Sequence, residues 1–317
     1  MRCVVTGAAG FVGSHLCELL LAQGDDVVGI DCFTDYYDPR CKETNLAQVL
    51  GHERFDLVRA DLLNAPLAGL LDGADVVYHL AGQPGVRPSW GSEFGTYVSH
   101  NILATQVLLE AARTSGLRKL VYASSSSVYG DAECYPTAET LRPRPISPYG
   151  VTKLAGEHLC ELYRKAFGLP TVSLRLFTVY GPRQRPDMAF SRLVAAGLRG
   201  SVFQLYGDGL QTRDFTYVGD VVQAMSSAAR SEFTGVANIG GGSRISMNDV
   251  IEIVSELAGQ PVIRRLPVQD GDVRDTAADI TTAAEGFGYA PRVGLREGLA
   301  EMVAAERLAG QAVRLSA

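Results

Sequence analysis

The chain has 317 residues, of which 46% are hydrophobic and 20% are charged, and its formal net charge is −6 at pH 7. This length suits one elaborated domain or two interlocked ones. The acidic balance provides no general field for a polyanion, so nucleic acid is not expected as a partner. No apolar run reaches the length of a membrane span, so no membrane association is expected either.

The six cysteines are scattered along the chain, and no two of them form a Cys-x-x-Cys pair. A chain of this size without clustered cysteines is typical of a reduced, cytoplasmic protein. The five histidines are isolated and show no spacing that suits a metal ion. The sequence therefore predicts a cytoplasmic protein without a metal site.

Short apolar runs alternate with helical patterns in the first half of the chain, which predicts βαβ units and a parallel sheet. The predicted strands are residues 2–6, 26–31, 57–60, 76–80, 119–124 and 171–176. Continuous apolar runs suit a sheet that helices cover on both faces. The expected fold class is α/β, a Rossmann-type doubly wound parallel sheet with a smaller α/β substrate-binding domain.

Three helices are predicted over residues 11–23, 97–114 and 149–167, where apolar residues recur at helical spacing. The second and third of these carry apolar residues on more than one side. Such extra faces fit a subunit interface, and they fit burial between the sheet and neighbouring loops equally well. The periodicity alone does not choose between the two.

The rhythm of the sequence changes after about residue 176, where glycine and proline become frequent and arginines gather in loops. We therefore divide the chain into a dinucleotide-binding domain, residues 1–178, and a smaller substrate-binding domain, residues 179–317. A late apolar run near residues 236–240 is predicted to return to the main sheet.

A glycine-rich run, Gly7-Ala-Ala-Gly10-Phe11-Val12-Gly13, follows the first predicted strand and opens a predicted helix. Glycines there permit a tight turn and a close approach of the backbone to a pyrophosphate, and the helix N-terminus offers N–H donors. Taken by itself, the spacing is explained equally well by a structural glycine turn.

A carboxylate at the end of the second strand favours the nucleotide interpretation. Asp31 lies 18 residues after Gly13, where it can accept hydrogen bonds from both ribose hydroxyls of adenosine. It would repel a 2′-phosphate, which favours NAD over NADP. The ends of the third and fourth strands add four cofactor candidates, Asp61, Leu62, Leu80 and Ala81. We therefore predict bound NAD.

Tyr149 is the only one of thirteen tyrosines with a lysine, Lys153, four residues later. On a helix the two side chains share a face, so a phenol and an ammonium can both meet the cofactor. A tyrosine base needs its pKa lowered from about 10, and the charges of Lys153 and of the nicotinamide can do this. The alternative is a surface pair on an amphipathic helix, which the upstream glycine run and Asp31 disfavour.

A run of four serines, from Ser124 to Ser127, follows an apolar strand and precedes Val128-Tyr129-Gly130. Hydroxyls at the carboxyl end of a parallel strand lie where ligands bind in such sheets. An isolated serine run usually marks a loop, but the strand before it weakens that interpretation.

Together, these motifs resemble the extended short-chain dehydrogenases that act on nucleotide sugars. Residues 175–182, 213–220 and 271–274 share the resemblance, which therefore covers nearly the whole chain. The resemblance implies that Ser125 is the catalytic hydroxyl and that Arg213 and Arg274 hold a pyrophosphate. We also assign Asn101, with Tyr149 and Lys153, to the cofactor site. The family further implies a homodimer built through the helices near 97–114 and 149–167.

The residues before Val128 bear on the reaction. Dehydratases of the family carry an Asp-Glu pair there, and decarboxylases carry a glutamate, whereas this chain has Ser126 and Ser127. The resemblance therefore implies 4-epimerisation, in which Tyr149 removes a proton from O4′ and a 4-keto sugar is reduced on its other face.

The sugar is expected to be a uronate. The segments 34–39, 177–183 and 185–189 look like those of UDP-glucuronate 4-epimerases, which form UDP-galacturonate. Hydroxyls of Ser126, Ser127 and Thr178, with Arg185, can hold a sugar carboxylate. A 4-keto uronate is a β-keto acid, so we expect this grip to keep it from losing carbon dioxide.

Three alternatives stay open at this stage. The nearest is a UDP-glucose or UDP-N-acetylglucosamine 4-epimerase in which Arg185 is only structural. A UDP-glucuronate decarboxylase is next, and a non-catalytic NAD sensor on the same fold is last, because it would not need Tyr149 and Lys153. Arg87 either contacts the substrate or orders its own loop.

Overall fold

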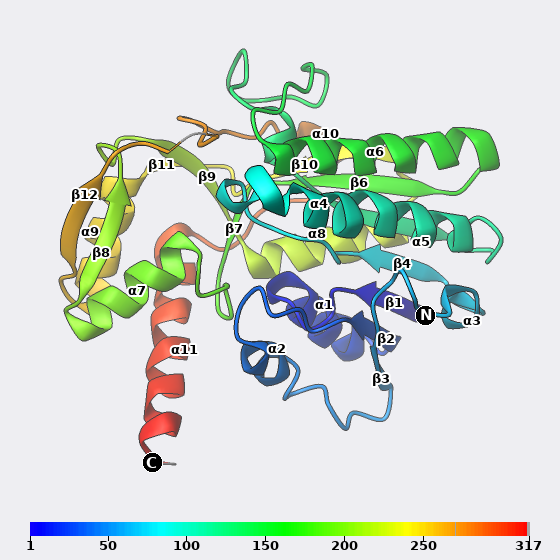
Figure 1. The fold of residues 1–317 in the computed structure, drawn as a ribbon, viewed down its shortest axis with the longest axis horizontal. Helices are drawn as coiled ribbons and strands as arrows, with labels where there is room; N and C mark the ends of the chain where they lie inside the picture. The colour runs from blue at the N-terminus through cyan, green and yellow to red at the C-terminus, as the bar shows by residue number, and fades with distance from the viewer. Residues whose placement is uncertain (270, 316–317) are drawn as a thin grey trace.

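The computed structural model describes residues 1–269 and 271–315. Its centre is a seven-stranded parallel sheet with the strand order β10-β6-β5-β4-β1-β2-β3, covered by helices on both faces (Figure 1). The strands are β1 (Arg2–Thr6), β2 (Asp26–Asp31), β3 (Phe55–Arg59), β4 (Val76–His79), β5 (Lys119–Ser125), β6 (Thr171–Leu176) and β10 (Gly235–Ile239). The predicted doubly wound α/β fold is confirmed.

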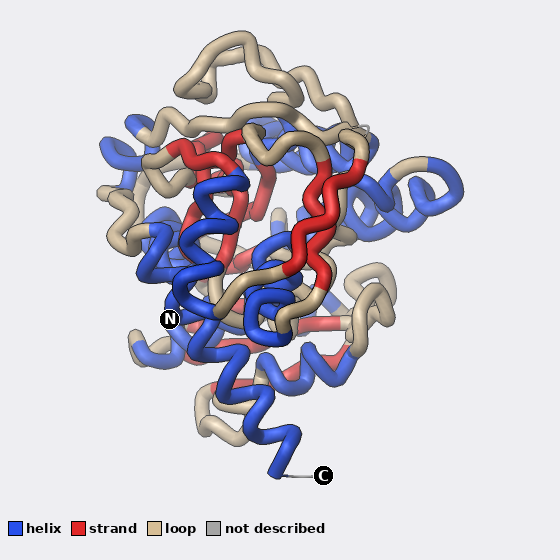
Figure 2. Tube along the Cα trace, turned by 90° about the vertical axis from the view of Figure 1, so that its left-hand side faces the viewer, coloured by secondary structure: helices blue, strands red, loops and turns tan. Residues whose placement is uncertain are grey.

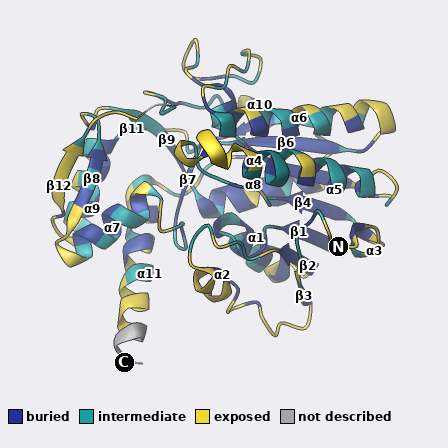
Figure 3. Cartoon of the chain, in the orientation of Figure 1, coloured by how far each residue is buried: buried dark blue, intermediate teal, exposed yellow. Residues whose placement is uncertain are grey.

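The sheet forms because its strands can be buried on both sides. One face packs against α1 (Phe11–Ala22), α8 (Val218–Arg230) and α10 (Thr281–Phe287). The other packs against α3 (Leu67–Leu71), α5 (Ala104–Ala112) and α6 (Pro148–Phe167). Figure 3 shows the strands as the most deeply buried layer. Apolar runs without alternation are what this double burial requires.

The predicted helix at 97–114 is one continuous helix whose middle segment is π-helical. It consists of α4 (Phe94–Tyr97), a π-helical segment Val98–Leu103, and α5. The π-turn contains Asn101, whose buried side chain is tied to the loop after β4 and to α6. Regular helical periodicity carries no sign of such a turn, which is why the sequence did not predict it.

The smaller part has two sheets and its own core. Its remaining elements are β7 (Thr178–Tyr180), β8 (Val202–Tyr206), β9 (Thr212–Tyr217), β11 (Arg244–Ser246), β12 (Val262–Leu266), α7 (Ala189–Arg199), α9 (Met247–Ala258) and α11 (Leu295–Leu315). Strands β11, β9 and β7 form one sheet, and β12 pairs with β8 in the other. Figure 2 views the molecule from this side, with α11 running away from the body toward the C-terminus.

The chain crosses between the two parts more than once. Strand β10 pairs in parallel with β6, so residues 235–239 complete the main sheet although they follow β7, β8 and β9 in sequence. The short helix α2 (Pro39–Asn45) lies in the connection from β2 to β3. The division into residues 1–178 and 179–317 stays a prediction.

Within residues 1–269 and 271–315, no helix has both the length and the hydropathy that crossing a membrane requires. The same ranges hold no cluster of three His, Cys, Asp or Glu side chains that could bind a metal ion.

Candidate active site

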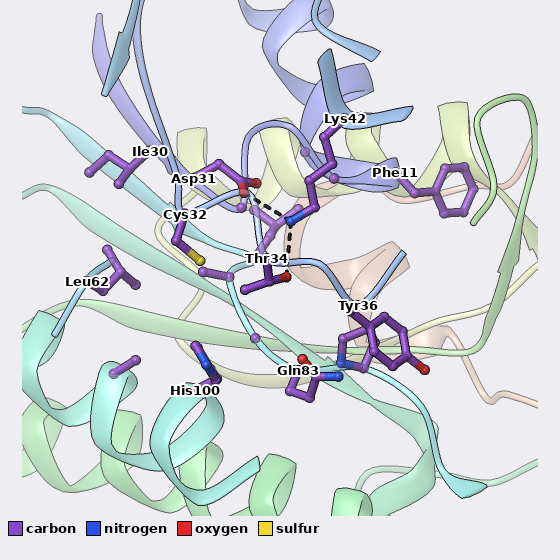
Figure 4. A pocket seen from close by; sticks show the side chains of 18 of the residues that line it. Phe11, Ile30, Asp31, Cys32, Thr34, Tyr36, Lys42, Leu62, Gln83 and His100 are labelled. Carbon is purple, nitrogen blue, oxygen red and sulfur yellow. Dashed lines mark hydrogen bonds and ion pairs between the residues drawn. The ribbon is translucent and has the colours of Figure 1, made fainter. Parts of the chain in front are cut away.

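A cavity opens at the carboxyl ends of β1, β2 and β4, where doubly wound sheets bind their ligands (Figure 4). Most of the cofactor residues predicted from the sequence line it together. They are Gly7, Gly10, Phe11, Val12, Gly13, Asp31, Asp61, Leu62, Leu80 and Ala81.

The glycine turn leaves no room for side chains. A Cβ atom on Gly13 would lie 2.1 Å from the carbonyl oxygen of Gly7, and one on Gly7 would lie 2.8 Å from the amide nitrogen of Ala81. Gly7 also has a φ of 71°, which L side chains rarely adopt. Because α1 begins directly after Gly10, its free N–H groups face the turn, and this cradle fits a pyrophosphate.

Asp31 is held firmly at the end of β2. Its carboxylate accepts hydrogen bonds from the backbone N–H groups of Ala9 at 3.1 Å and Phe33 at 2.8 Å. The Nζ atom of Lys42 also lies 3.2 Å from it, with both side chains buried (Figure 4). Lys42 balances the charge of Asp31, so repulsion alone does not explain a preference for NAD over NADP.

Sequence reasoning missed several lining residues because they lie in loops and on short helices. These include Cys32, Thr34, Tyr36, Lys42, Gln83 and His100. The one available signal for Lys42 was the scarcity of lysine, since the chain has only four. Lys42 lies on helix α2, and Asp38 caps this helix because its carboxylate accepts a hydrogen bond from the N–H of Arg40. Pro39 occupies the first helical position.

His79, at the end of β4, has a structural role in the wall of this cavity. Its ring lies between the hydroxyls of Thr6, at 2.8 Å, and Thr105, at 2.9 Å. Burial lowers the pKa of His79 to about 3, so the ring is neutral. The Thr6 hydroxyl in turn accepts from the N–H of Ala81, which fixes the cavity wall.

Asn101 lies behind this wall and not among its lining residues. Its amide donates to the carbonyl oxygen of Gln83 at 3.0 Å and to the hydroxyl of Thr152 at 2.9 Å, and its oxygen accepts from the N–H of Gln83. These bonds occupy the side chain. The structure therefore places Asn101 where it orders the loop after β4, and its contact with the cofactor stays a prediction.

The predicted catalytic residues come together on β5 and α6. Ser147 caps α6 by accepting from the N–H of Gly150, and Pro148 fills the first helical position, so Tyr149 stands in the first turn. The helix approaches β5 closely, because a Cβ on Gly156 would lie 2.2 Å from the hydroxyl of Tyr122. Ser125 ends β5, and its hydroxyl acts to lower the pKa of Tyr149.

Lys153 is buried one turn after Tyr149. Its Nζ atom donates to the carbonyl oxygen of Ala123 at 2.8 Å and lies 5.0 Å from the ring centre of Tyr122. Burial lowers the pKa of Lys153 to about 8, against opposing contributions from neighbouring groups.

Burial also raises the pKa of Tyr149, and two groups act in the opposite direction. These two groups are the hydroxyl of Ser125 and the positively charged guanidinium of Arg185. The sequence predicted that Lys153 would lower the pKa of Tyr149, but in this structure its ammonium is bound to Ala123. Arg185 was assigned from the sequence only to the sugar, so its effect on the base is a finding of the structure.

A second cavity adjoins the first and belongs mainly to the smaller part. Of the predicted substrate residues it is lined by Arg87, Thr178, Arg213 and Arg274. Tyr36 lines both cavities, so they meet at this side chain.

The three arginines of this cavity are held to different degrees. Arg213 donates to the carbonyl oxygens of Arg274, at 2.8 Å, and of Thr212, at 2.9 Å. Arg87 pairs with Asp272 at 2.6 Å and stacks over the ring of Tyr206. The side chain of Arg274 is 69% exposed and lies 3.5 Å from Asp208. The guanidinium of Arg213 is therefore held in place by its hydrogen bonds, whereas the exposed side chain of Arg274 can turn toward an anion.

Two serines of the predicted substrate site lie in the turn that follows β5. Ser126 and Ser127 form a short 3₁₀ turn after Ser125 and are not among the described residues that line the two cavities. The N–H of Ser127 donates to the hydroxyl oxygen of Ser125 at 3.1 Å.

Arg185 lies at the junction of the two cavities. It lines the first, while its partner Asp187 lines the second. The two side chains form a bidentate pair with both N–O distances at 2.9 Å. A sugar carboxylate would therefore share Arg185 with Asp187.

The sheet, the glycine cradle, Asp31 and the Ser125–Tyr149–Lys153 set define a dinucleotide-dependent enzyme of the extended short-chain dehydrogenase class. The chain belongs to the NAD dependent epimerase/dehydratase family, whose model matches residues 3–240. The resemblance inferred from the sequence is confirmed.

Relatives with known names cover nearly the whole chain. The solved UDP-glucuronic acid 4-epimerase of Bacillus cereus, in complex with UDP-glucuronic acid and NAD, is 44% identical, with a TM-score of 0.94 over 98% of this chain and 100% of that one. The UDP-glucuronate 4-epimerase of Thermodesulfobacterium geofontis is 36% identical over 95% of this chain and 94% of its own. The UDP-glucose 4-epimerase of Mycolicibacterium smegmatis is 38% identical over 96% and 97%.

Proposed function

We propose that this protein is an NAD-dependent isomerase that converts UDP-glucuronate to UDP-galacturonate through a 4-keto intermediate. The observation that carries the proposal is the Ser125–Tyr149–Lys153 set beside a glycine cradle that fits a dinucleotide. Relatives crystallised with NAD support the cofactor, and relatives named for UDP-glucuronate support the sugar. Bound in the cradle, NAD supplies the exchange of a hydride with C4′.

The side chains of this site supply acid–base chemistry. Tyr149 takes the proton of O4′ when the alcohol is oxidised and returns a proton when the ketone is reduced. Because the Ser125 hydroxyl acts to lower the pKa of Tyr149, we infer that it donates a hydrogen bond to the phenolate form in the reaction. Ser126 and Ser127 stand where dehydratases and decarboxylases of the family carry acids, so the chain has no acid there to direct either reaction.

The second cavity provides groups for the rest of the substrate. Arg213 and Arg274 are the proposed pyrophosphate ligands, since guanidinium groups suit phosphate oxygens. Thr178 offers a hydroxyl from β7, and Arg185 with Asp187 forms a neutral pair beside Tyr149. We infer that neutral hydroxyls make most of the contacts with the uronate carboxylate. The predicted contacts of Ser126 and Ser127 with that carboxylate are part of this proposal.

The exposed apolar side chains on α6 and the π-helical segment support a homodimer. Val151 is 47% exposed and Leu162 is 56% exposed on α6, and Leu103 is 47% exposed beside them. Large apolar side chains on neighbouring helices favour association. The dimer, and a cytoplasmic location, belong to the proposal.

The proposed function is tested by mixing purified protein with UDP-glucuronate, without added NAD, and separating the UDP-sugars over time. Formation of UDP-galacturonate supports both the epimerase and a cofactor that is retained and regenerated. UDP-xylose or a 4-keto pentose as main product contradicts the proposal in favour of decarboxylation. Conversion of UDP-glucose, with UDP-glucuronate unchanged after NAD is added, favours a neutral-sugar epimerase instead.

We expect Thr178→Val to weaken the grip on the carboxylate. A hydrogen bond to a charged group contributes about 1.5–3 kcal/mol, so KM for UDP-glucuronate should rise about 10-fold or more. The 4-keto intermediate should then lose carbon dioxide more often, which chromatography detects as pentose product. Thr178→Ser, which keeps the hydroxyl, is the matched control. Unchanged KM and no added pentose in Thr178→Val would show that this hydroxyl does not hold the carboxylate.

A further inference from the structure

A buried ion pair lies beneath the catalytic residues. The side chains of Arg175 on β6 and Glu157 on α6 are 5% and 4% exposed, and they form a bidentate pair with N–O distances of 3.0 and 2.8 Å. Removing two charges from water is costly, and a buried pair is often no more stabilising than apolar side chains of similar volume. Stability alone is therefore a weak reason for this pair.

The pair is bonded to both flanks of Ser125. On one side, the hydroxyl of Ser124 donates to the carboxylate of Glu157. On the other, Arg175 donates to the hydroxyl of Tyr129 at 2.8 Å and lies over its ring. The residue before Ser125 and the turn after it are thus fixed to the same two charges.

The network continues to the edge of the sheet. The hydroxyl of Tyr129 donates to the side-chain oxygen of Asn238 on β10 at 2.8 Å. Asn238 in turn donates to the carbonyl oxygens of Thr137 and Asp279. Strands β5, β6 and β10, helix α6 and two loops are therefore joined around the end of β5, which leaves Ser125 little freedom to move.

Glu157 also acts on Lys153 through its charge. Tyr149, Lys153 and Glu157 follow one another at four-residue spacing on α6, so they share one face of the helix. Burial lowers the pKa of Lys153 to about 8, and Cys160 and the negative charge of Glu157 act in the opposite direction.

The other titratable groups around Lys153 are uncharged at neutral pH. Burial lowers the pKa of His79 to about 3 and raises that of Cys160 to about 12. It also raises the pKa values of Tyr122 and Tyr149. Among the described groups around Lys153, Glu157 is therefore the one that carries negative charge, and its partner Arg175 carries the positive charge that balances it.

We propose that Glu157 and Arg175 are positioning residues, a buried ion pair that holds Ser125 against Tyr149 and keeps Lys153 charged. Both side chains are buried and are bonded to each other, to Ser124 and to Tyr129, so they act through other residues. The inference rests on the proposed function, which assigns the catalytic roles of Ser125, Tyr149 and Lys153.

The test compares wild type with Glu157→Gln as holoenzymes turning over UDP-glucuronate. Misplacement of a reacting group by about 1 Å can cost about 10²-fold in rate, so we expect kcat to fall about 100-fold. KM should change little, because the substrate cavity is untouched. The alkaline limb of the kcat–pH profile should move to lower pH, because Lys153 loses the one negative charge beside it.

A second variant separates positioning from stability, since Glu157→Gln leaves Arg175 buried without its partner. Glu157→Gln/Arg175→Met removes both charges, so its melting temperature should recover toward that of wild type while kcat stays low. Its alkaline limb should shift less than that of Glu157→Gln, because no unbalanced positive charge remains. A double variant with wild-type kcat overturns the proposal.

Two more variants complete the design. Asp25→Asn removes an equally buried carboxylate, paired with Arg230 at the amino ends of the strands, and should lower the melting temperature without changing kcat or the pH profile. Ser124→Ala removes only the hydroxyl bonded to Glu157 and should lower kcat about 10-fold, the cost of one charged hydrogen bond. If the charge variants fail to fold, an unchanged kcat in Ser124→Ala overturns the proposal.

The wild type serves as the reference for the function itself. A wild type that leaves UDP-glucuronate unchanged contradicts the proposed function and not this inference, and the variants are then compared on UDP-glucose. A wild type that is active, with Glu157→Gln equal to it in kcat and in pH profile, contradicts the inference and leaves the proposed function intact.

Discussion

Tyr149→Phe should lower kcat by at least about 10³-fold, because general acid–base catalysis by a positioned side chain contributes about 10²–10⁴-fold. The phenol hydroxyl is the group that exchanges a proton with O4′ in the proposed reaction. Phenylalanine keeps the ring that packs edge-on against Tyr97, with ring centres 6.3 Å apart. Removal of one oxygen should therefore leave the fold and both cavities in place.

The measurement is kcat for UDP-glucuronate, together with UDP-sugar affinity by calorimetry and the NAD content of the purified protein. Tyr163→Phe is the matched control, because Tyr163 lies on the same helix but bonds to Glu110 and Gln106, away from the cavities. We expect the control to retain activity. If Tyr149→Phe keeps more than a tenth of wild-type kcat, another group is the base.

Gly13→Ala should abolish the retention of NAD. The added Cβ would lie 2.1 Å from the carbonyl oxygen of Gly7 and 3.0 Å from the Cα of Ala8, so the turn itself would have to move. Backbone atoms cannot yield as the end of a flexible side chain does. Because the turn also aims the N–H groups of α1, its displacement should raise the Kd for NAD about 100-fold or more.

NAD content after gel filtration and Kd from titration of the stripped protein measure this effect. Gly69→Ala is the control, since Gly69 lies on α3 and a Cβ there would meet nothing within 4 Å. We expect Gly69→Ala to retain NAD as wild type does. Bound NAD in Gly13→Ala at the wild-type level would show that the cradle is not the pyrophosphate site.

Most of the sheet was predictable because its signals are local. Strands β1, β2 and β6 match their predicted bounds, since each is a short run rich in apolar residues that is buried along nearly its whole length. Strand β3 was placed at 57–60 and runs from Phe55 to Arg59, because its first residues alternate between buried and exposed and resemble a loop. Strand ends of this kind are fixed by pairing with the neighbour, which is a tertiary contact.

The candidate site divides in the same way. Gly7, Gly13 and Asp31 line one cavity, as their positions after the first strand and at the end of the second predicted, because a turn and the end of the next strand have a fixed geometry within one βαβ unit. Asn101 was assigned to the cofactor from the sequence, and only the structure shows its bonds to the distant residues Gln83 and Thr152. The spacing of residues along a helix does not reveal which distant partner will occupy a side chain.

By itself, the sequence determined the doubly wound fold, the dinucleotide-binding turn after the first strand and the Tyr149–Lys153 pair. Each of them follows from short-range periodicity and from residue types that few other side chains can replace. Only the tertiary structure decided how the charges are paired: Lys42 with Asp31, Arg185 with Asp187, and Glu157 with Arg175. The physical reason is that a buried charge requires a partner, and packing chooses that partner from side chains that are distant or unremarkable in the sequence.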